Sequence, residues 1–145
     1  MTDLHSLSPT EILGLTIIGE SRGESIAGQV AVGNVIRNRA NYNKSTYHDI
    51  CLAPKQFSCW NEDDSNRSLL LELADQLING QFITDPYLKQ CMFVAKGIVE
   101  LELLDNTNGA TNYLTSQLFF DGKTPSWAKN AKNLRTIGNQ IFFNL

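Results

Sequence analysis

Residues 8–39 read SPTEILGLTIIGESRGESIAGQVAVGNVIRNR and predict two consecutive helices. The first begins with a capping box, in which the Ser8 hydroxyl accepts from the backbone three residues on and Glu11 reaches back. Pro9 suits the first helical position, so this helix should run from about Pro9 to Glu20. Its expected inward positions include Ile12, Leu13, Thr16 and Ile17.

The second helix should open at Ser25 and run to about Arg39. Gly23 lies between the two helices and can end or bend the first. Gly28 and Gly33 lower the helix propensity of the second, but they allow another backbone to approach closely. We therefore expect this helix to be the central, tightly packed one. Its apolar side would use Ala27, Val30, Ala31, Val35 and Ile36.

The rest of the chain predicts shorter elements. Helices are expected at about Thr46–Leu52, at Leu69–Ile78 and, after the Asp85-Pro86 cap, at Tyr87–Glu102. The stretch Lys55–Asn61 is typical of either a strand or an ordered loop, and β character appears in Tyr113–Phe120 and Leu134–Phe143. Gly138-Asn139 suits a tight hairpin turn within the last of these. The prediction is one α+β domain over residues 1–145, mostly helical with a small β region.

Composition and charge limit the function. A chain of 145 residues with 42% hydrophobic and 19% charged residues fits one soluble globular domain. Its net charge of −3 argues against nucleic acid or an anionic membrane as the main partner. No apolar run approaches the roughly 18 residues that a membrane helix needs, and the N-terminal sequence lacks the basic and apolar regions of a signal peptide. We therefore expect no membrane insertion, and synthesis in a cytoplasm without a signal peptide.

Cysteines and histidines form no metal or nucleophile pattern. Cys51, Cys59 and Cys91 are odd in number and lack C-x-x-C spacing, which favours free buried thiols, with a Cys51–Cys59 pair as the alternative. His5 and His48 fit no H-E-x-x-H or other metal spacing. The chain also has no G-x-S-x-G elbow and no P-loop. We expect neither a metal nor a cofactor.

Two carboxylates, Glu20 and Glu24, flank the junction between the first two helices. A carboxylic acid held at a helix end against apolar neighbours such as Ile17 and Ile18 tends toward a raised pKa, and it can protonate a leaving-group oxygen. A solvated surface charge is the equal alternative for Glu20. On a continuous helix Glu24 would share a face with Glu20; otherwise it suits the start of the second helix or an ion pair with Arg22.

Aromatic and amide side chains gather in Gln56-Phe-Ser-Cys-Trp-Asn61. Indole faces stack on sugar rings, and amides bind hydroxyl and acetamido groups, so Trp60 here and Trp127 further along are candidate sugar-binding residues. Tyr113 follows a glycine turn in Gly109-Ala-Thr-Asn-Tyr113 and would point into a cleft. For each of these aromatic residues, packing in the core is the alternative.

Taken in chain order, these motifs resemble the SleB-type cell-wall hydrolase family, which is known from spore-cortex-lytic enzymes and phage lysins. The resemblance covers nearly the whole chain. It rests on the segments Ile18–Glu24, Gly28–Arg39, Gln56–Asn61, Gly109–Tyr113, Pro125–Trp127 and Ile137–Phe143. One of these motifs alone would be weak evidence, whereas the ordered set is strong.

The resemblance implies a lysozyme-like α+β fold that cleaves the β-1,4 glycan of peptidoglycan, with Glu20 as the catalytic acid. It also implies a groove that binds the glycan. The residues expected to bind it are Glu24, Gln56, Ser58, Trp60, Asn61, Thr111, Asn112, Tyr113 and Trp127. The chain departs from the family at Ser21, where alanine is usual, and at Asn112, where histidine is usual. The second departure leaves open whether Asn112 supplies only a hydrogen bond.

Two completions of this reaction are open. In a lytic transglycosylase the muramic acid closes on its own C6 hydroxyl with the help of a single glutamate, whereas a hydrolytic muramidase needs a second carboxylate. The other acids considered lack the apolar setting of Glu20, which favours the transglycosylase. They are Glu24, Glu62, Asp63, Asp64 and Asp105. The expected partner is the glycan strand of peptidoglycan, and the expected state is a monomer.

The expected biological setting is a phage endolysin, made in the host cytoplasm and released to act on the cell wall. Two alternatives remain. A non-catalytic glycan-binding or phage structural module would keep Trp60 and Trp127 without depending on Glu20. An enzyme that cuts the peptide stems would release amino groups rather than sugar ends.

Overall fold

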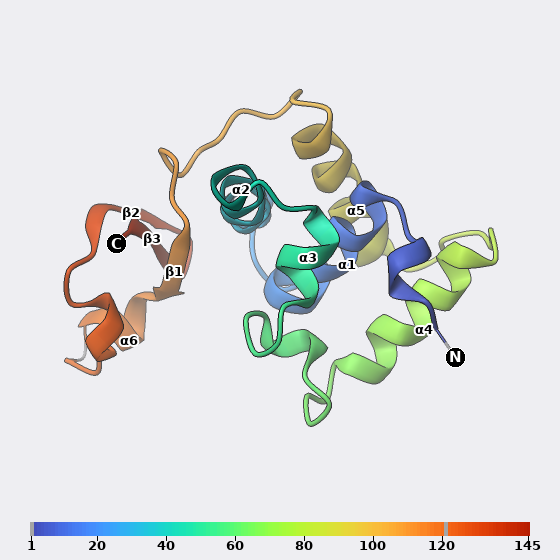
Figure 1. The fold of residues 1–145 in the computed structure, drawn as a ribbon, viewed down its shortest axis with the longest axis horizontal. Coiled ribbons are helices and arrows are strands. Elements are labelled where there is room, and N and C mark those ends of the chain that lie inside the picture. Colours follow the sequence, from blue (N-terminus) through green and yellow to red (C-terminus); the bar gives the residue numbers. More distant parts are fainter. Residues whose placement is uncertain (1, 121) are drawn as a thin grey trace.

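The computed structural model describes residues 2–120 and 122–145, and in it a group of helices lies beside a small sheet (Figure 1). We call residues 9–99 the helical part, and residues 112–120 with 122–144 the sheet part. The elements are η1 (Leu4–Ser6), α1 (Pro9–Ser21), α2 (Ile26–Asn43), α3 (Tyr47–Leu52), η2 (Ser58–Trp60), α4 (Arg67–Ile78), α5 (Pro86–Val99), β1 (Asn112–Thr115), α6 (Ser116–Phe120), η3 (Ser126–Ala128), β2 (Lys132–Ile137) and β3 (Gln140–Asn144). The predicted α+β class is confirmed.

Helix α1 lies at the centre of the helical part. Its capping box is present, because the Ser8 hydroxyl accepts from the Glu11 N–H at 3.1 Å and the Glu11 carboxylate accepts from the Ser8 N–H at 2.8 Å. Residues 12–18 are all buried, so this helix is enclosed on every side, and it contacts α2, α3, α4 and α5. The sequence predicted α2 as the central helix. This prediction is wrong, because α1 occupies the central position (Figure 1).

Helix α2 begins where the sequence predicts and ends one turn later. The Ser25 hydroxyl accepts from the Gly28 N–H, but the helix continues past Arg39 to Asn43, with Lys44 in the left-handed conformation as its cap. Gly33 does permit a close approach, although side chains make it rather than a backbone. A Cβ there would collide with the Ile98 side chain of α5 and lie 3.1 Å from that of Ile17 in α1.

The other helix predictions hold with small shifts. Helices α3, α4 and α5 appear in the expected stretches, and the Asp85 carboxylate caps α5 through the Tyr87 and Leu88 N–H groups. The stretch Lys55–Asn61, open between strand and loop, is an ordered loop that contains the short helix η2.

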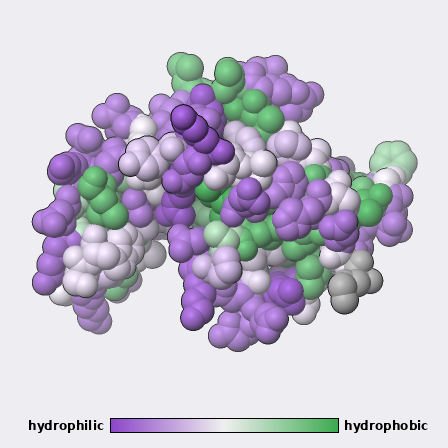
Figure 2. All heavy atoms as spheres, in the orientation of Figure 1, coloured by the Kyte–Doolittle hydropathy of each residue, from purple (hydrophilic) through white to green (hydrophobic). Residues whose placement is uncertain are grey.

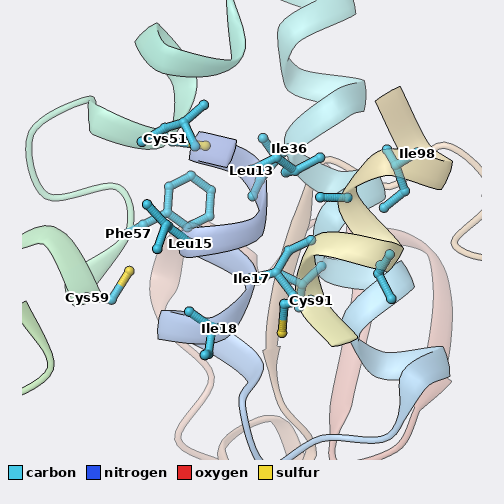
Figure 3. Close-up of a cluster of buried hydrophobic side chains, with 14 of the residues drawn as sticks. Leu13, Leu15, Ile17, Ile18, Ile36, Cys51, Phe57, Cys59, Cys91 and Ile98 are labelled. Carbon is cyan, nitrogen blue, oxygen red and sulfur yellow. The ribbon is translucent and has the colours of Figure 1, made fainter. Parts of the chain in front are cut away.

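Side chains from several helices meet in the main core (Figure 3). Leu13 and Ile17 of α1, Ile36 of α2 and Ile98 of α5 are all fully buried there. The three cysteines also lie in this core with free thiols, as predicted, and do not pair. Burial raises the pKa of the Cys51 thiol to about 12, so this thiol is neutral and unreactive at physiological pH.

The sheet has three antiparallel strands in the order β1-β3-β2. Gly138, with φ of 58°, lies at the predicted hairpin turn between β2 and β3. The β character predicted for residues 113–120 is only half correct, since the strand ends at Thr115 and α6 follows. The Thr115 hydroxyl accepts from the Leu118 N–H, which starts a helical turn instead of extending the strand.

Strand β3 joins the two parts because its side chains alternate between two cores. Phe142 is fully buried in the main core of the helices. Its neighbours Ile141 and Phe143 point the other way and pack with Ala128 in a second, smaller cluster. Phe142 therefore attaches the sheet part to the helical part, together with the partly buried Tyr113 of β1 and Ile137 of β2, which pack against the same core.

The surface is mostly hydrophilic and is hollowed between the sheet part and the helical part (Figure 2). Among the described residues, none of the helices has the length and apolar character needed to cross a bilayer.

Candidate active site

Glu20 lies in the last turn of α1, and each of its carboxylate oxygens accepts a hydrogen bond. The Tyr113 hydroxyl donates to Oε1 at 2.9 Å from strand β1 of the sheet part. The Cys59 backbone N–H donates to Oε2 at 3.2 Å from η2. The carboxylate is half-buried and held between two segments that are far apart in the sequence.

Gly19 explains how the η2 turn comes so close to Glu20. A Cβ at Gly19 would lie 2.7 Å from both Cβ and Sγ of Cys59, which is closer than side chains can approach. Only glycine at this position lets the turn rest against α1 with the Cys59 N–H directed at the carboxylate. The sequence Gly19-Glu20 therefore places the acid and makes room for its donor.

A pocket of about 490 Å³ opens in front of Glu20. It is lined by Glu20, Arg39, Lys55, Gln56, Phe57, Ser58, Asn112, Tyr113 and Trp127. Five residues predicted to bind glycan thus meet the predicted acid, although they come from three separate stretches of the chain. The Trp127 side chain is 49% exposed, and its ring lies 6.1 Å from that of Phe143. Phe143 therefore supports the Trp127 indole, which lines the pocket.

Tyr113 is a hydrogen-bond donor to Glu20 because its phenol stays protonated. Burial raises its pKa well above the ordinary value, and the negative charge of Glu20 raises it further, while Arg39 opposes the shift. Asn112, next to it, uses its side-chain oxygen to accept from the Thr111 hydroxyl at 3.0 Å. Asn112 also lines the pocket.

Arg39 is a residue of this pocket that the sequence analysis did not single out. Its guanidinium lies 5.2 Å from the centre of the Phe57 ring, and its Nε donates to the Thr111 carbonyl at 2.7 Å. Burial lowers the pKa of Arg39, while Tyr113 and Glu20 raise it. A signal was present, since Arg39 follows Ile36 on the inward side of α2, where an arginine without a function is rare. Lys55, which the sequence analysis also did not single out, adds a second cationic side chain to the pocket.

Three predicted binding residues lie elsewhere. Trp60 packs against the main core and donates from Nε1 to the Thr16 hydroxyl at 3.0 Å, which matches the core alternative. Asn61 follows it and is not among the residues that line the pocket. The Glu24 carboxylate faces the β2–β3 turn, where a Cβ on Gly138 would lie 3.2 Å from its Oε2. A fourth, Thr111, lines a neighbouring pocket instead.

Asp105, another acid considered in the sequence analysis, does not line the Glu20 pocket and has a structural role. Its carboxylate accepts from the Thr107 N–H and hydroxyl, from the Gly109 N–H and from the Asn38 amide, at 2.6–3.0 Å. Burial alone would raise the pKa of Asp105, but these hydrogen bonds outweigh it and lower the pKa. The carboxylate thus ties the 105–109 turn to α2. In residues 2–120 and 122–145, no three His, Cys, Asp or Glu side chains cluster as metal ligands.

Comparisons with known proteins identify the family and the fold. A family model described as Cell Wall Hydrolase matches residues 23–143, a range that begins three residues after Glu20. The structure is similar to that of the catalytic domain of the germination-specific lytic transglycosylase SleB from Bacillus anthracis. That match has 23% identity and a TM-score of 0.59, and it covers 94% of this chain and 93% of the other.

The catalytic domain of the Bacillus cereus SleB protein matches equally well, with the same identity and TM-score, over 94% of this chain and 89% of the other. No curated protein matches the sequence significantly. At this level of identity the two structures establish the fold, and the family model establishes the family.

Proposed function

The chain belongs to the cell wall hydrolase family, and we propose that it cleaves the glycan strand of peptidoglycan between N-acetylmuramic acid and N-acetylglucosamine, with Glu20 as the general acid. The observation that carries the proposal is the setting of Glu20. It is the only carboxylate among the described residues that line its pocket, and two donors hold it in place.

In the first step, protonated Glu20 donates its proton to the glycosidic oxygen, and the C–O bond to the muramic acid breaks. Positive charge develops on that sugar as the leaving alcohol departs. The carboxylate left behind keeps the hydrogen bonds from the Tyr113 hydroxyl and the Cys59 N–H, which stabilise its new negative charge. Arg39 adds a nearby positive charge.

In the second step, the ionised Glu20 removes the proton from the C6 hydroxyl of the same muramic acid, and that oxygen closes on C1. The products are a 1,6-anhydromuramic end and a regenerated acid, so protons balance over the cycle. This lytic transglycosylase route needs one carboxylate. A hydrolytic muramidase with a second carboxylate is less well supported, because Glu24 faces the β2–β3 turn and Asp105 is held by four donors.

The other lining residues suit a sugar substrate. The half-exposed Trp127 ring offers an apolar face on which a sugar ring can stack. The carboxamides of Gln56 and Asn112, which line the pocket, can form hydrogen bonds to hydroxyl and acetamido groups. Because all of these side chains come from one chain, we propose that a monomer is sufficient for activity.

Digestion of purified peptidoglycan, followed by mass spectrometry of the products, tests the proposal. We expect anhydromuramic ends from the unmutated protein and a loss of about 10²–10⁴-fold in Glu20→Gln, the usual contribution of a general acid. Glu72→Gln, which changes an exposed glutamate of α4, is the matched control and should keep full activity.

Each other outcome contradicts part of the proposal. Hydrated reducing ends would mean a hydrolase. Free amino groups would mean a stem-peptide cleaving enzyme. Full activity of a folded Glu20→Gln protein would exclude Glu20 as the acid, and no cleavage at all would favour a glycan-binding module.

We further propose that the biological role is that of a phage endolysin. This role is supported by the proposed activity, because an enzyme that cuts glycan strands weakens the wall enough to lyse a cell. Turbidity of growing cells that express the protein should rise as in cells without it until a membrane pore is co-expressed, and should then fall. Lysis without the pore, or none with it, would contradict this role.

A further inference from the structure

We propose that a second pocket, next to the Glu20 pocket, binds further sugar units of the same glycan strand; this inference rests on the proposed function. The second pocket has a volume of about 810 Å³ and lies where the last turns of α2 face β1 and the end of β3. It is lined by Asn38, Arg39, Asn41, Tyr42, Asn43, Gln56, Gly109, Thr111, Asn112, Asn144 and Leu145.

The two pockets share part of their lining. Arg39, Gln56 and Asn112 line both of them, so they form the boundary across which a bound polymer would pass. Trp127 lines only the Glu20 pocket, and Tyr42 lines only the second. A glycan strand that lies across Glu20 and extends away from Trp127 would therefore enter the second pocket.

The lining chemistry suits uncharged sugars. Six carboxamide side chains line the second pocket, and none of its lining residues has an acidic side chain. Within the described residues, the amides of Asn41, Asn43 and Gln56 make no hydrogen bond, so their donors and acceptors are available to a ligand. A carboxamide both donates and accepts, which matches the hydroxyl and acetamido groups of N-acetylated sugars.

Tyr42 provides an apolar surface beside these amides. Its side chain is 83% exposed, although a tyrosine ring is usually at least partly covered. It lies between Asn41 and Asn43 in the last turn of α2, at the pocket. An exposed aromatic ring beside free amides can stack on the apolar face of a sugar while the amides bind its polar groups.

Charge favours sugars over the stem peptide as the occupant. Stem peptides carry carboxylates, which would call for several cations. Arg39 is the single cationic side chain among the residues that line this pocket, and its guanidinium is already placed over Phe57 and bonded to the Thr111 carbonyl. The pocket is therefore assigned to the glycan itself.

The test measures binding without cleavage. In a Glu20→Gln background, the dissociation constants of peptide-free glycan fragments of increasing length are measured by calorimetry. We expect affinity to increase with length until the second pocket is filled. Adding Tyr42→Ala should weaken the long fragments about tenfold and leave the shortest unchanged, since one aromatic stacking contact is lost. Tyr42→Phe keeps the ring and should bind like the parent.

Phe82→Ala is the matched control, because Phe82 is 95% exposed but lies outside the groove; it should not change binding at any length. Equal weakening of short and long fragments by Tyr42→Ala, or no weakening, would overturn the assignment. Weakening seen only with peptide-bearing fragments would overturn it in favour of the stem peptide. These results do not depend on cleavage, so a failure of the proposed activity would be seen separately, in the digestion of peptidoglycan.

Discussion

The helical part and the sheet part both supply the pocket, but they are held in place by different means. Glu20 extends from a helix whose residues 12–18 are all buried and which has helices on every side. Tyr113 and Trp127 come from a part in which β2 is almost entirely exposed and the second cluster has three buried members, Ala128, Ile141 and Phe143.

This difference shows where the geometry of the site is vulnerable. The acid is positioned by a large core, so many single substitutions would leave it in place. Its partners in the sheet part depend on a few attachments: Phe142 in the main core, and hydrogen bonds from Asn38 and Arg39 to the carbonyls of Ala110 and Thr111. Loss of one of these should separate Tyr113 from Glu20 without unfolding the helices.

The largest effect is expected from the two neighbouring phenylalanines of β3. Phe142→Ala empties a fully buried position in the main core and should lower the free energy of unfolding by about 3–5 kcal/mol. Phe143→Ala, on the opposite face of the same strand, should destabilise the molecule less but still reduce activity, because Phe143 packs against Trp127. Chemical denaturation and peptidoglycan digestion of both variants would measure this. A greater loss of stability in Phe143→Ala would reverse the roles given to the two cores.

Gly19→Ala tests the contact on the helical side of the pocket. The added methyl group would overlap Cys59, so η2 should move away and the free energy of unfolding should fall by about 1–3 kcal/mol. Activity should fall as well, because the Cys59 N–H would leave Glu20. Gly23→Ala is the matched control, since nothing lies within 4 Å of a Cβ there. A fully active Gly19→Ala protein would show that the Cys59 donor is dispensable.

Tyr113→Phe tests the contact from the sheet side. It removes only the hydroxyl that donates to Glu20, so kcat should fall about tenfold while KM and the unfolding temperature change little. Tyr87→Phe, at an exposed tyrosine of α5, should change none of these. A rise in KM with unchanged kcat would instead make Tyr113 a substrate-binding residue.

The sequence predicted local features well because short-range hydrogen bonds determine them. Ser8, Ser25 and Asp85 all cap helices as expected. Helix α6 was missed because residues 116–120 are too few for periodicity to separate a helix from a strand, and Thr115 capping decided the outcome.

The site was predictable in part. The resemblance of the motifs, taken in chain order, to one family allowed us to predict that Tyr113 and Trp127 lie in the same groove as Glu20, and all three line one pocket. Trp60 could not be placed, since a 3-10 turn directs neighbouring side chains to different sides and only the packing shows which side is the core. Arg39 was overlooked because its role depends on Phe57 and Thr111, which are distant in the sequence.

The smallest effect concerns Asp105, whose carboxylate fixes the 105–109 turn between the two parts. Asp105→Asn replaces acceptor oxygen by an NH₂ group that faces donors, and it should cost about 1 kcal/mol of stability at pH 7.

The lowered pKa of Asp105 determines how this contribution to stability changes with pH. The folded pKa of Asp105 lies below the ordinary value of 3.8, so the ionised carboxylate stabilises the fold above that pH. This contribution is lost as the pH falls from 3.8 through the folded pKa. The difference in unfolding free energy between the unmutated protein and Asp105→Asn should therefore be constant near neutrality and shrink in acid, as measured by denaturation at several pH values. Asp63→Asn, at an exposed loop position, should show no such change. A difference independent of pH would mean that the turn is held by its shape rather than by the charge of Asp105.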